Sequence, residues 1–274
     1  MNLVKNRVVG MHPIFYMTIL LVAQWISSSA LAENMQQKGF DIAARSDRSD
    51  RGFSDSEVKM TMVLQNAAGK KATRTLRLKT LEIPNESVGD KSLILFSTPK
   101  DIEGTALLSH AKMLESDDQW LYLPALKRVK RISSKNKSGP FVGSEFAFED
   151  FTASELNKFK YEYLRQESCG VLICDVVERA PLYENSGYTK QIVWVDSIEY
   201  QLRVIEFYDR KGSLLKELRL KDYRLYKNKY WRPHLLTMKN LQTKKNSDLV
   251  YGEYKFKVGL SNSDFLKGRL SSLR

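Results

Sequence analysis

Histidine and cysteine are scarce in this sequence, and their scarcity argues against most metal-dependent and nucleophilic catalysis. The 274 residues include three histidines and two cysteines. His110 and His234 lie far apart, and neither belongs to a zinc-protease motif. The sequence also lacks the Gly-x-Ser-x-Gly motif of hydrolases and the glycine-rich loop that binds nucleotide phosphates. We therefore interpret both histidines as ordinary surface or loop residues, and we expect no enzyme, no metal site and no cofactor.

Long hydrophobic runs are equally rare, because the chain has one, near its N-terminus. Lys5 and Arg7 precede an apolar stretch over 14–26, and small residues follow it as far as Ala32. A single membrane anchor is the alternative, but the stretch is short for a hydrocarbon core of about 30 Å. We predict a signal peptide that is cleaved after Ala32. No cysteine lies directly after the apolar stretch, so a lipid-anchored form is not expected, and in a bacterium the exported chain would be periplasmic.

Positive charge is in excess. Lysine and arginine number 44 against 32 acidic residues, which gives a formal charge of +12, or +10 without the predicted signal peptide. In the cytoplasm this balance would suggest nucleic acid, but an exported protein meets lipid phosphates and acidic protein surfaces instead. We therefore expect no nucleic-acid partner and only peripheral contact with membranes.

The densest basic cluster is KRVKRISSKNK, at 127–137. It has two interpretations that the sequence leaves open. One is a charged edge strand that resists aggregation. The other is a docking surface for an anionic headgroup or an acidic partner. The docking interpretation rests on four residues: Lys127, Arg128, Lys130 and Arg131.

The two cysteines, Cys169 and Cys174, lie five residues apart in SCGVLIC. A straight strand would separate them by about 16 Å, too far for a disulfide. A hairpin that turns near Gly170 would bring them together. An exported protein meets oxidising conditions, so we predict a structural disulfide, with two buried free thiols as the alternative.

Alternation of apolar and polar residues dominates the chain beyond its N-terminal region. Over residues 58–64, Val58, Met60, Met62 and Leu64 alternate with mostly polar residues, and similar segments separated by short turns recur towards the C-terminus. This pattern predicts a large antiparallel sheet with few helices. Between Leu78 and Leu81 the apolar phase slips, which predicts a β-bulge. We divide the chain into a signal peptide over 1–32, an N-terminal helix and connector over 33–57, and a single β domain over 58–274 that ends in a short helix.

Several predicted strands are apolar on both faces. In DDQWLYLPAL, Trp120 and Tyr122 point one way while Leu121 and Leu123 point the other. A sheet with one face in water would not need this. We therefore expect a strongly curved sheet whose concave face is covered by helices or lines a cavity. A core wall and a cavity wall have the same composition, so the sequence does not separate these two cases.

The stretch GPFVGSEFAFEDF, at 139–151, combines three carboxylates with four phenylalanines. Phe146 and Phe148 alternate with Glu145 and Glu149, so the acids lie opposite the aromatic rings. No histidine or nucleophile accompanies them. We interpret the stretch as a shaped apolar element with structural acids and not as an active site.

Together, DDQWLYLPALKRVKRI and GPFVGSEFAFEDF resemble the hallmark segment of the outer membrane lipoprotein-sorting proteins of the LolA/LolB-like superfamily. Family members carry W-L-Y-L-P-x-L-x-R-x-R-I followed by F-M-G-S-D-F-x-Y-E-D. Here Val142, Glu145 and Phe148 replace the usual Met, Asp and Tyr. The resemblance continues in collinear order, through RSDRGFSDSEVKMTMVL and WRPHLLTMKN to DFLKGRL, and covers nearly all of the chain beyond Ala32.

The resemblance implies a half-open β-barrel with helices covering its concave face, and a cavity that holds acyl chains in the relatives. The resemblance implies no catalytic residues. It suggests that the protein functions together with a transporter of the resistance-nodulation-division type. We expect a lipid, lipoprotein or other amphiphile as ligand; a non-carrier accessory or scaffold protein of an envelope transport complex is the alternative. The residues predicted to line the cavity are Phe96, Leu107, Trp120, Tyr122, Leu123, Phe141, Phe146, Phe148 and Trp194.

Overall fold

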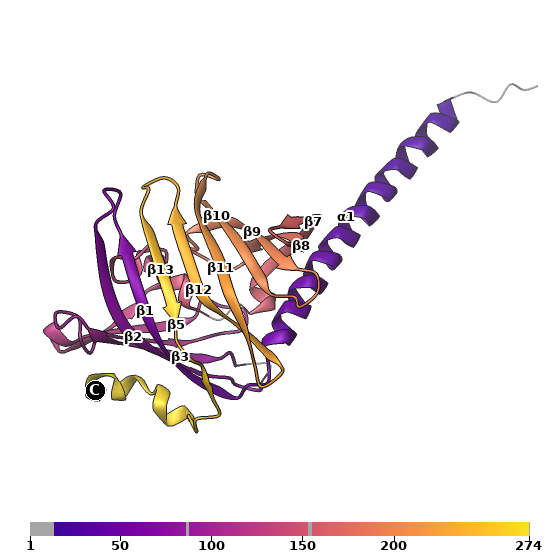
Figure 1. Ribbon diagram of the computed structural model, residues 1–274. Coiled ribbons are helices and arrows are strands. Elements are labelled where there is room, and N and C mark those ends of the chain that lie inside the picture. The colour runs from indigo at the N-terminus through magenta and orange to yellow at the C-terminus, as the bar shows by residue number, and fades with distance from the viewer. Residues whose placement is uncertain (1–13, 86–87, 153–154, 274) are drawn as a thin grey trace, which may run out of the picture.

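One antiparallel sheet of fourteen strands makes up most of the protein (Figure 1). The structure is a computed structural model that describes residues 14–85, 88–152 and 155–273. Thirteen strands follow the order β6-β5-β4-β3-β2-β1-β13-β12-β11-β10-β9-β8-β7, and β14 pairs with β1. The sheet is strongly curved and does not close, since β6 and β7 are its two ends. The predicted fold class, a half-open antiparallel sheet with few helices, is confirmed.

The strands are β1 Asp55–Gln65, β2 Lys71–Leu81, β3 Lys91–Thr98, β4 Ala106–His110, β5 Asp118–Leu123, β6 Arg128–Ile132, β7 Phe159–Cys169, β8 Leu172–Pro181, β9 Tyr188–Asp196, β10 Leu202–Asp209, β11 Leu214–Tyr226, β12 Tyr230–Asn240, β13 Asn246–Tyr251 and β14 Lys255–Phe256. The helix is α1 Ile14–Asp50, and the short 3-10 turns are η1 Pro124–Leu126, η2 Ser134–Asn136, η3 Phe141–Gly143, η4 Phe148–Phe151, η5 Leu156–Lys158, η6 Asn262–Phe265 and η7 Lys267–Ser272.

The long helix α1 crosses the predicted cleavage point after Ala32, and β1 begins four residues after α1 ends. Part of the predicted signal peptide, residues 1–13, lies outside the described residues, and its cleavage stays a prediction. Within the described ranges, no helix combines the length and apolarity that crossing a membrane requires.

Strand β1 shows why the alternating pattern produces this sheet. Val58, Met60 and Met62 are almost completely buried on one face, and the strand pairs along its length with β2. The β-bulge predicted between Leu78 and Leu81 is wrong, because the β1–β2 register is continuous there. The apolar phase slips because β2 contributes to two cores: Leu78 packs in the core of the concave face and Leu81 in a second core.

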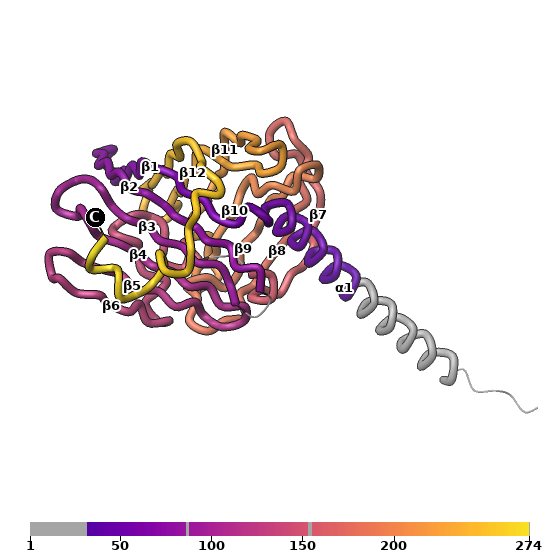
Figure 2. The backbone as a smooth tube through the Cα atoms, turned by 90° about the horizontal axis from the view of Figure 1, so that it is seen from below, coloured from indigo at the N-terminus to yellow at the C-terminus, as the bar shows by residue number. Residues whose placement is uncertain are grey.

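That second core lies on the convex face, beneath the C-terminal segment. Phe265 of η6 and Leu270 of η7 are buried against β3 to β6, and the segment runs along this side of the sheet in Figure 2. His110 is held there by a 2.8 Å hydrogen bond between its Nε2 and the Phe265 carbonyl. Strands β4 and β5 are therefore apolar on both sides because both faces of the sheet are covered there.

The two sheet edges are protected in different ways. Edge strand β6 is five residues long and carries exposed basic side chains, both of which discourage pairing with another chain. Edge strand β7 is covered by α1. A Cβ added at Gly39 of α1 would lie 2.8 Å from the backbone nitrogen of Tyr163, so glycine permits the close approach. Lys38 completes the contact, with its Nζ 3.5 Å from the centre of the Tyr163 ring.

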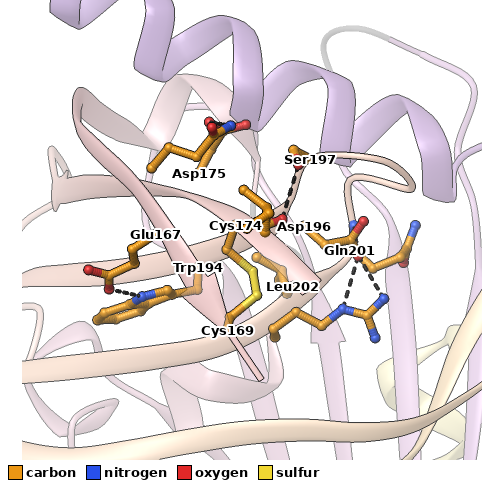
Figure 3. The surroundings of a disulfide bond; sticks show 12 residues. Glu167, Cys169, Cys174, Asp175, Trp194, Asp196, Ser197, Gln201 and Leu202 are labelled. Carbon is orange, nitrogen blue, oxygen red and sulfur yellow. Dashed lines mark hydrogen bonds and ion pairs between the residues drawn. A yellow bond between two sulfur atoms is a disulfide. The ribbon is translucent and has the colours of Figure 1, made fainter. Parts of the chain in front are cut away.

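The predicted disulfide between Cys169 and Cys174 is confirmed. Strands β7 and β8 form a hairpin that turns at Gly170, whose φ is +79°, and the two Cα atoms lie 5.8 Å apart. Figure 3 shows the bond near the tip of this hairpin, beside Trp194, whose indole Nε1 donates to Glu167 at 2.6 Å. The bond therefore cross-links the two strands at the exposed end of the edge hairpin.

We predict that replacing Cys169 and Cys174 together by alanine lowers the free energy of unfolding by about 2 kcal/mol, because a short loop loses its cross-link in the unfolded chain. Urea denaturation followed by circular dichroism measures this loss. Wild-type protein in a thiol reductant is the matched comparison and should lose a similar amount. Equal stability of oxidised and reduced wild-type protein would contradict the stabilising role.

Candidate ligand cavity

The segment between β6 and β7, which the structure describes over 133–152 and 155–158, connects the two ends of the open sheet, and its described residues cover the concave face. Its phenylalanines form one cluster: the Phe141 ring centre lies 4.6 Å from that of Phe151 and 5.6 Å from that of Phe148. Phe141 also contacts Phe96 of β3, with ring centres 5.7 Å apart. The stretch 139–151 is thus the central part of a cover, in agreement with its interpretation as a shaped apolar element.

Buried acids attach this cover to the far half of the sheet. Glu149 accepts hydrogen bonds from the Gly187 backbone nitrogen at 2.8 Å, the Ser186 hydroxyl at 2.9 Å and the Tyr183 hydroxyl at 3.2 Å. All three partners belong to the β8–β9 turn and its margins. Burial, the largest influence, raises the pKa of the Glu149 carboxyl above its ordinary value of 4.5.

Asp150 makes the second attachment. Its carboxylate pairs with Lys216 of β11 at 2.7 Å and accepts from the Tyr188 hydroxyl at 2.7 Å. It also accepts from the Ala147 backbone nitrogen at 2.7 Å, which caps the first turn of η4. Lys216 is almost fully buried and donates a further bond to the Glu145 carbonyl at 2.9 Å. The acids of this stretch therefore hold the cover in place.

Beneath the cover, the larger of two adjoining cavities has a volume of about 480 Å³. Its wall combines the concave sheet with α1, which contributes Ala43, and with the cover, which contributes Phe151 and Leu156. The leucine, isoleucine and valine side chains that the sheet contributes are Leu78, Ile94, Val177, Val193, Val195, Leu202 and Leu220. The structure thus leaves a ligand-sized space within the concave face.

The second cavity, of about 230 Å³, adjoins the first and shares part of its lining, including Phe151, Arg179 and Tyr251. Most of its other side chains are aromatic or aliphatic. Its polar end holds a buried ion pair between Lys158 and Asp117. Lys137 donates beside it to the Ser116 hydroxyl at 2.9 Å, and burial lowers the pKa of the Lys137 amine.

Charged groups surround the larger cavity where α1 ends. Arg51 bridges two carboxylates, 2.7 Å from Asp47 and 3.3 Å from Glu155. Arg232 of β12 pairs with Asp50 and lies against three aromatic rings, and burial lowers the pKa of its guanidinium to about 10. Among the described residues, the Oε1 atom of Glu155 has no hydrogen-bond partner, and burial raises the pKa of that carboxyl. The last turn of α1 is therefore tied to both the cover and the sheet.

The nine residues predicted to line the cavity occupy three different places. Phe96, Leu107, Leu123, Phe141, Phe146 and Phe148 belong to the core of the concave face. Of the nine, Phe146 alone lines either of the two cavities, while the other five fill the core beside them. Trp120 and Tyr122 belong to the convex core. Trp194 lies between the inward residues Val193 and Val195 on β9, so it also faces the convex side.

The four residues of the predicted docking surface lie together, away from both cavity linings. Lys127 ends η1, and Arg128, Lys130 and Arg131 belong to the exposed edge strand β6. Arg131 is paired with Asp118 on the neighbouring strand. The placement suits edge protection, and the docking role of these residues stays a prediction.

Sequence reasoning missed the charged groups of the cavity walls, among them Arg179 and Lys158, and it misplaced His234. A signal existed for Arg179, because it follows the inward residue Val177 by two positions on β8. The interpretation of His234 as a surface or loop residue is wrong. It is buried on β12, bonded through Nε2 to the Tyr226 hydroxyl and through Nδ1 to the Tyr251 carbonyl.

Comparisons with known proteins identify solved structures that share this architecture. A domain from Vibrio parahaemolyticus, named as an outer membrane lipoprotein-sorting protein, is 48% identical, with a TM-score of 0.83 over 86% of this chain and 99% of its own. A DUF1329 family protein from Desulfovibrio piger is 25% identical, with a TM-score of 0.81 over 86% of this chain and 99% of its own. A LolA superfamily protein from Nitrosomonas europaea, 21% identical with a TM-score of 0.67 over 84% of this chain and 98% of its own, shares the fold.

A family model described as an uncharacterized protein matches residues 89–272. No curated protein sequence matches the chain. The fold and its covered space define the class, an open β half-barrel of the LolA type. Within that class, the chain belongs to the outer membrane lipoprotein-sorting protein family.

We predict that Lys216→Met lowers the free energy of unfolding by about 3 kcal/mol, because it leaves the Asp150 carboxylate buried without its cation. Urea denaturation measures the loss. Lys221→Met is the matched control, since it removes the same charge from an exposed position on the same strand. Equal losses in the two variants would show that the buried pair does not stabilise the cover.

We predict that Glu149→Gln changes the pH dependence of stability. Because burial raises the pKa of Glu149 in the folded state, the wild-type carboxyl contributes most below its ordinary value of 4.5, and this contribution is lost as pH rises through the raised pKa. The variant lacks this titration. The stability of wild type relative to the variant should therefore fall as pH rises above 4.5.

Denaturation at a series of pH values measures this difference. Glu184→Gln, which removes an exposed carboxyl from the same β8–β9 turn, is the control for the loss of a surface carboxylate. A Glu149→Gln difference that grows with pH would contradict the assignment.

Proposed function

We propose that the protein is a periplasmic carrier that encloses the apolar part of a lipid, lipoprotein or other amphiphile between its curved sheet and its cover. The observation that carries the proposal is the cavity of about 480 Å³ beneath residues 133–158. That volume lies in the range of sites that enclose a small-molecule ligand. The relative that is 48% identical is named for lipoprotein sorting, which supports the same class of cargo.

Transfer of an acyl chain into this cavity is a partition problem. Each buried methylene contributes about 0.8 kcal/mol relative to water, so a wall of valine, leucine and phenylalanine competes with a bilayer. The carrier has no energy source of its own, and release therefore requires an acceptor or a docking partner. An inner-membrane transporter of the resistance-nodulation-division type is the partner we propose.

The basic edge strand β6 is the surface proposed for contact with an anionic headgroup or an acidic partner. Its exposed side chains at 127–131 lie outside the cavity linings, where they can meet a membrane or a protein while the ligand stays enclosed. The contact is electrostatic and should weaken as salt concentration rises.

A non-carrier accessory or scaffold protein of a transport complex is the second candidate. It is favoured by the close filling of the concave core, where Phe96 and Phe141 are almost completely buried. A scaffold would bind protein through β6 and carry no lipid. The two candidates therefore differ in what the purified protein contains.

We predict that protein isolated from the periplasm carries an amphiphile and that Ala43→Phe lowers its occupancy at least fivefold. Ala43 of α1 lines the larger cavity, and a phenyl ring there would fill space the ligand needs. Native mass spectrometry measures the occupancy. Ala72→Phe, at an exposed position on β2, is the control and should keep wild-type occupancy. A bare wild-type protein that captures a membrane transporter would favour the scaffold.

A further inference from the structure

Acidic side chains outnumber basic ones on the wall of the larger cavity, six to four, although the protein as a whole carries a formal charge of +12. Three of these acids form one group, called here the acidic cluster: Asp47, Asp90 and Glu155. They come from the last turns of α1, the connection between β2 and β3, and the cover. The charges of all three act on a single guanidinium, that of Arg51. One end of the cavity is therefore locally acidic.

Arg51 neutralises only part of the acidic cluster. Its Nε donates to Asp47 at 2.7 Å, whereas its Nη2 lies 3.3 Å from an oxygen of Glu155. The hydrogen bond to Asp47 raises the pKa of the guanidinium most, and the charges of Asp90 and Glu155 raise it further. One cation among three carboxylates leaves an excess of negative charge.

Glu155 and Asp90 retain capacity to accept hydrogen bonds. The Glu155 side chain is buried, and its Oε1 has no hydrogen-bond partner among the described residues. Asp90 accepts from the Ile83 backbone nitrogen at 2.8 Å. Burial, the largest influence, raises the pKa of both carboxyls, and the charge of Asp90 adds to the rise at Glu155. Because a buried acceptor without a donor costs free energy, a ligand that brings N–H donors and positive charge would stabilise this end of the cavity.

The other three cations of the wall act mainly on other groups. Arg232 pairs with Asp50. Lys91 extends to η6, where its Nζ donates to a side-chain oxygen at 2.6 Å. Arg179 lies at the junction with the smaller cavity, and the carboxylate whose charge acts on it is Asp150. These cations therefore leave the charge of the acidic cluster only partly balanced.

We propose that the acidic end of the larger cavity binds the protonated amine head of a single-chain amphiphile, with Glu155 and Asp90 accepting its N–H donors. An ammonium group is a compact charge with three donors and no acceptor, so it matches carboxylate oxygens that lack donors. The hydrocarbon chain lies along the apolar wall, which includes Leu78 of β2 and Ile94 of β3. This inference rests on the proposed carrier function and makes it specific, because it assigns the charge of the enclosed head.

The test compares two probes that share one hydrocarbon chain, decylamine and 1-decanol, on the wild-type protein freed of co-purified lipid. Isothermal titration calorimetry at neutral pH gives the two dissociation constants. We expect decylamine to bind at least tenfold more tightly than the alcohol, a difference of about 1.4 kcal/mol. The positive charge of the whole protein opposes unspecific attraction of an ammonium ion, so this preference reports the cavity. Equal binding of the two probes, or tighter binding of the alcohol, would overturn the inference while leaving the carrier function intact.

Variants then locate the head. Glu155→Gln keeps the size of the side chain and an acceptor for Arg51, but it removes the negative charge. It should lower the preference for decylamine to about threefold or less while leaving the affinity for 1-decanol within about twofold. Glu103→Gln, which removes the same charge from an exposed position between β3 and β4, is the matched control and should keep the wild-type preference. A Glu155→Gln protein with the wild-type preference would overturn the assignment of the head to the acidic cluster.

A second variant and a second measurement keep the test decisive. If thermal unfolding shows that Glu155→Gln does not fold, Asp90→Asn removes the other proposed acceptor charge and should also lower the preference for decylamine; an unchanged preference in this variant would overturn the assignment. Binding of neither probe by wild-type protein would overturn the inference. If native mass spectrometry then finds no co-purified amphiphile either, the carrier function is overturned with it.

Discussion

An open sheet of fourteen strands has an apolar concave face that must be covered, and the rest of this structure depends on how that face is covered. The chain solves the problem with the connection between the two ends of the sheet, residues 133–158, together with the last turns of α1. Because β6 and β7 are not paired to each other, the connection between them must cross the opening. It is thereby held at both ends, and its phenylalanines lie against the inner face of the strands.

The cover is attached largely through polar and charged groups, and this explains how a space can persist beneath it. Glu149 and Asp150 bond to the β8–β9 region and to Lys216, and Arg51 joins α1 to the cover at Glu155. Directional bonds fix the position of a segment without requiring that every gap below it be filled. Apolar packing alone would favour a cover that collapses onto the sheet, since voids forfeit dispersion contacts.

Positively charged residues lie in two different environments, and the amino-acid composition does not distinguish them. The exposed basic residues of β6 protect a sheet edge and are available to an anionic surface. The enclosed cations at Arg179, Lys137 and Lys158 line the cavities. The excess of lysine and arginine is the sum of both groups.

The sequence by itself determined the antiparallel sheet, the hairpin disulfide between Cys169 and Cys174, and the structural role of the acids in 139–151. The sheet and the disulfide depend on neighbours along the chain or on alternation within one strand, and such local patterns are visible in a single sequence. The interpretation of the acids as structural rested on the absence of an accompanying histidine or nucleophile, and their partners, such as Lys216 for Asp150, come from distant strands. Strands that are apolar on both faces predicted the curvature. The family resemblance implied a cover made of helices, whereas the structure covers the face with α1 and with a connection that contains only short 3-10 turns. Opposite orientations for Trp120 and Leu121 also followed from alternation alone.

Only the tertiary structure decided which apolar face surrounds a cavity and which is a filled core. Trp120 and Tyr122 belong to the convex core because the C-terminal segment folds back over them. No sequence pattern within β5 predicts that contact. His234 is buried because Tyr226 and Tyr251 supply its partners from neighbouring strands. The cavity itself depends on the height at which the cover is held above the sheet. That height follows from contacts between residues far apart in sequence, such as Asp150 with Lys216, and those contacts exist only once the sheet has curved.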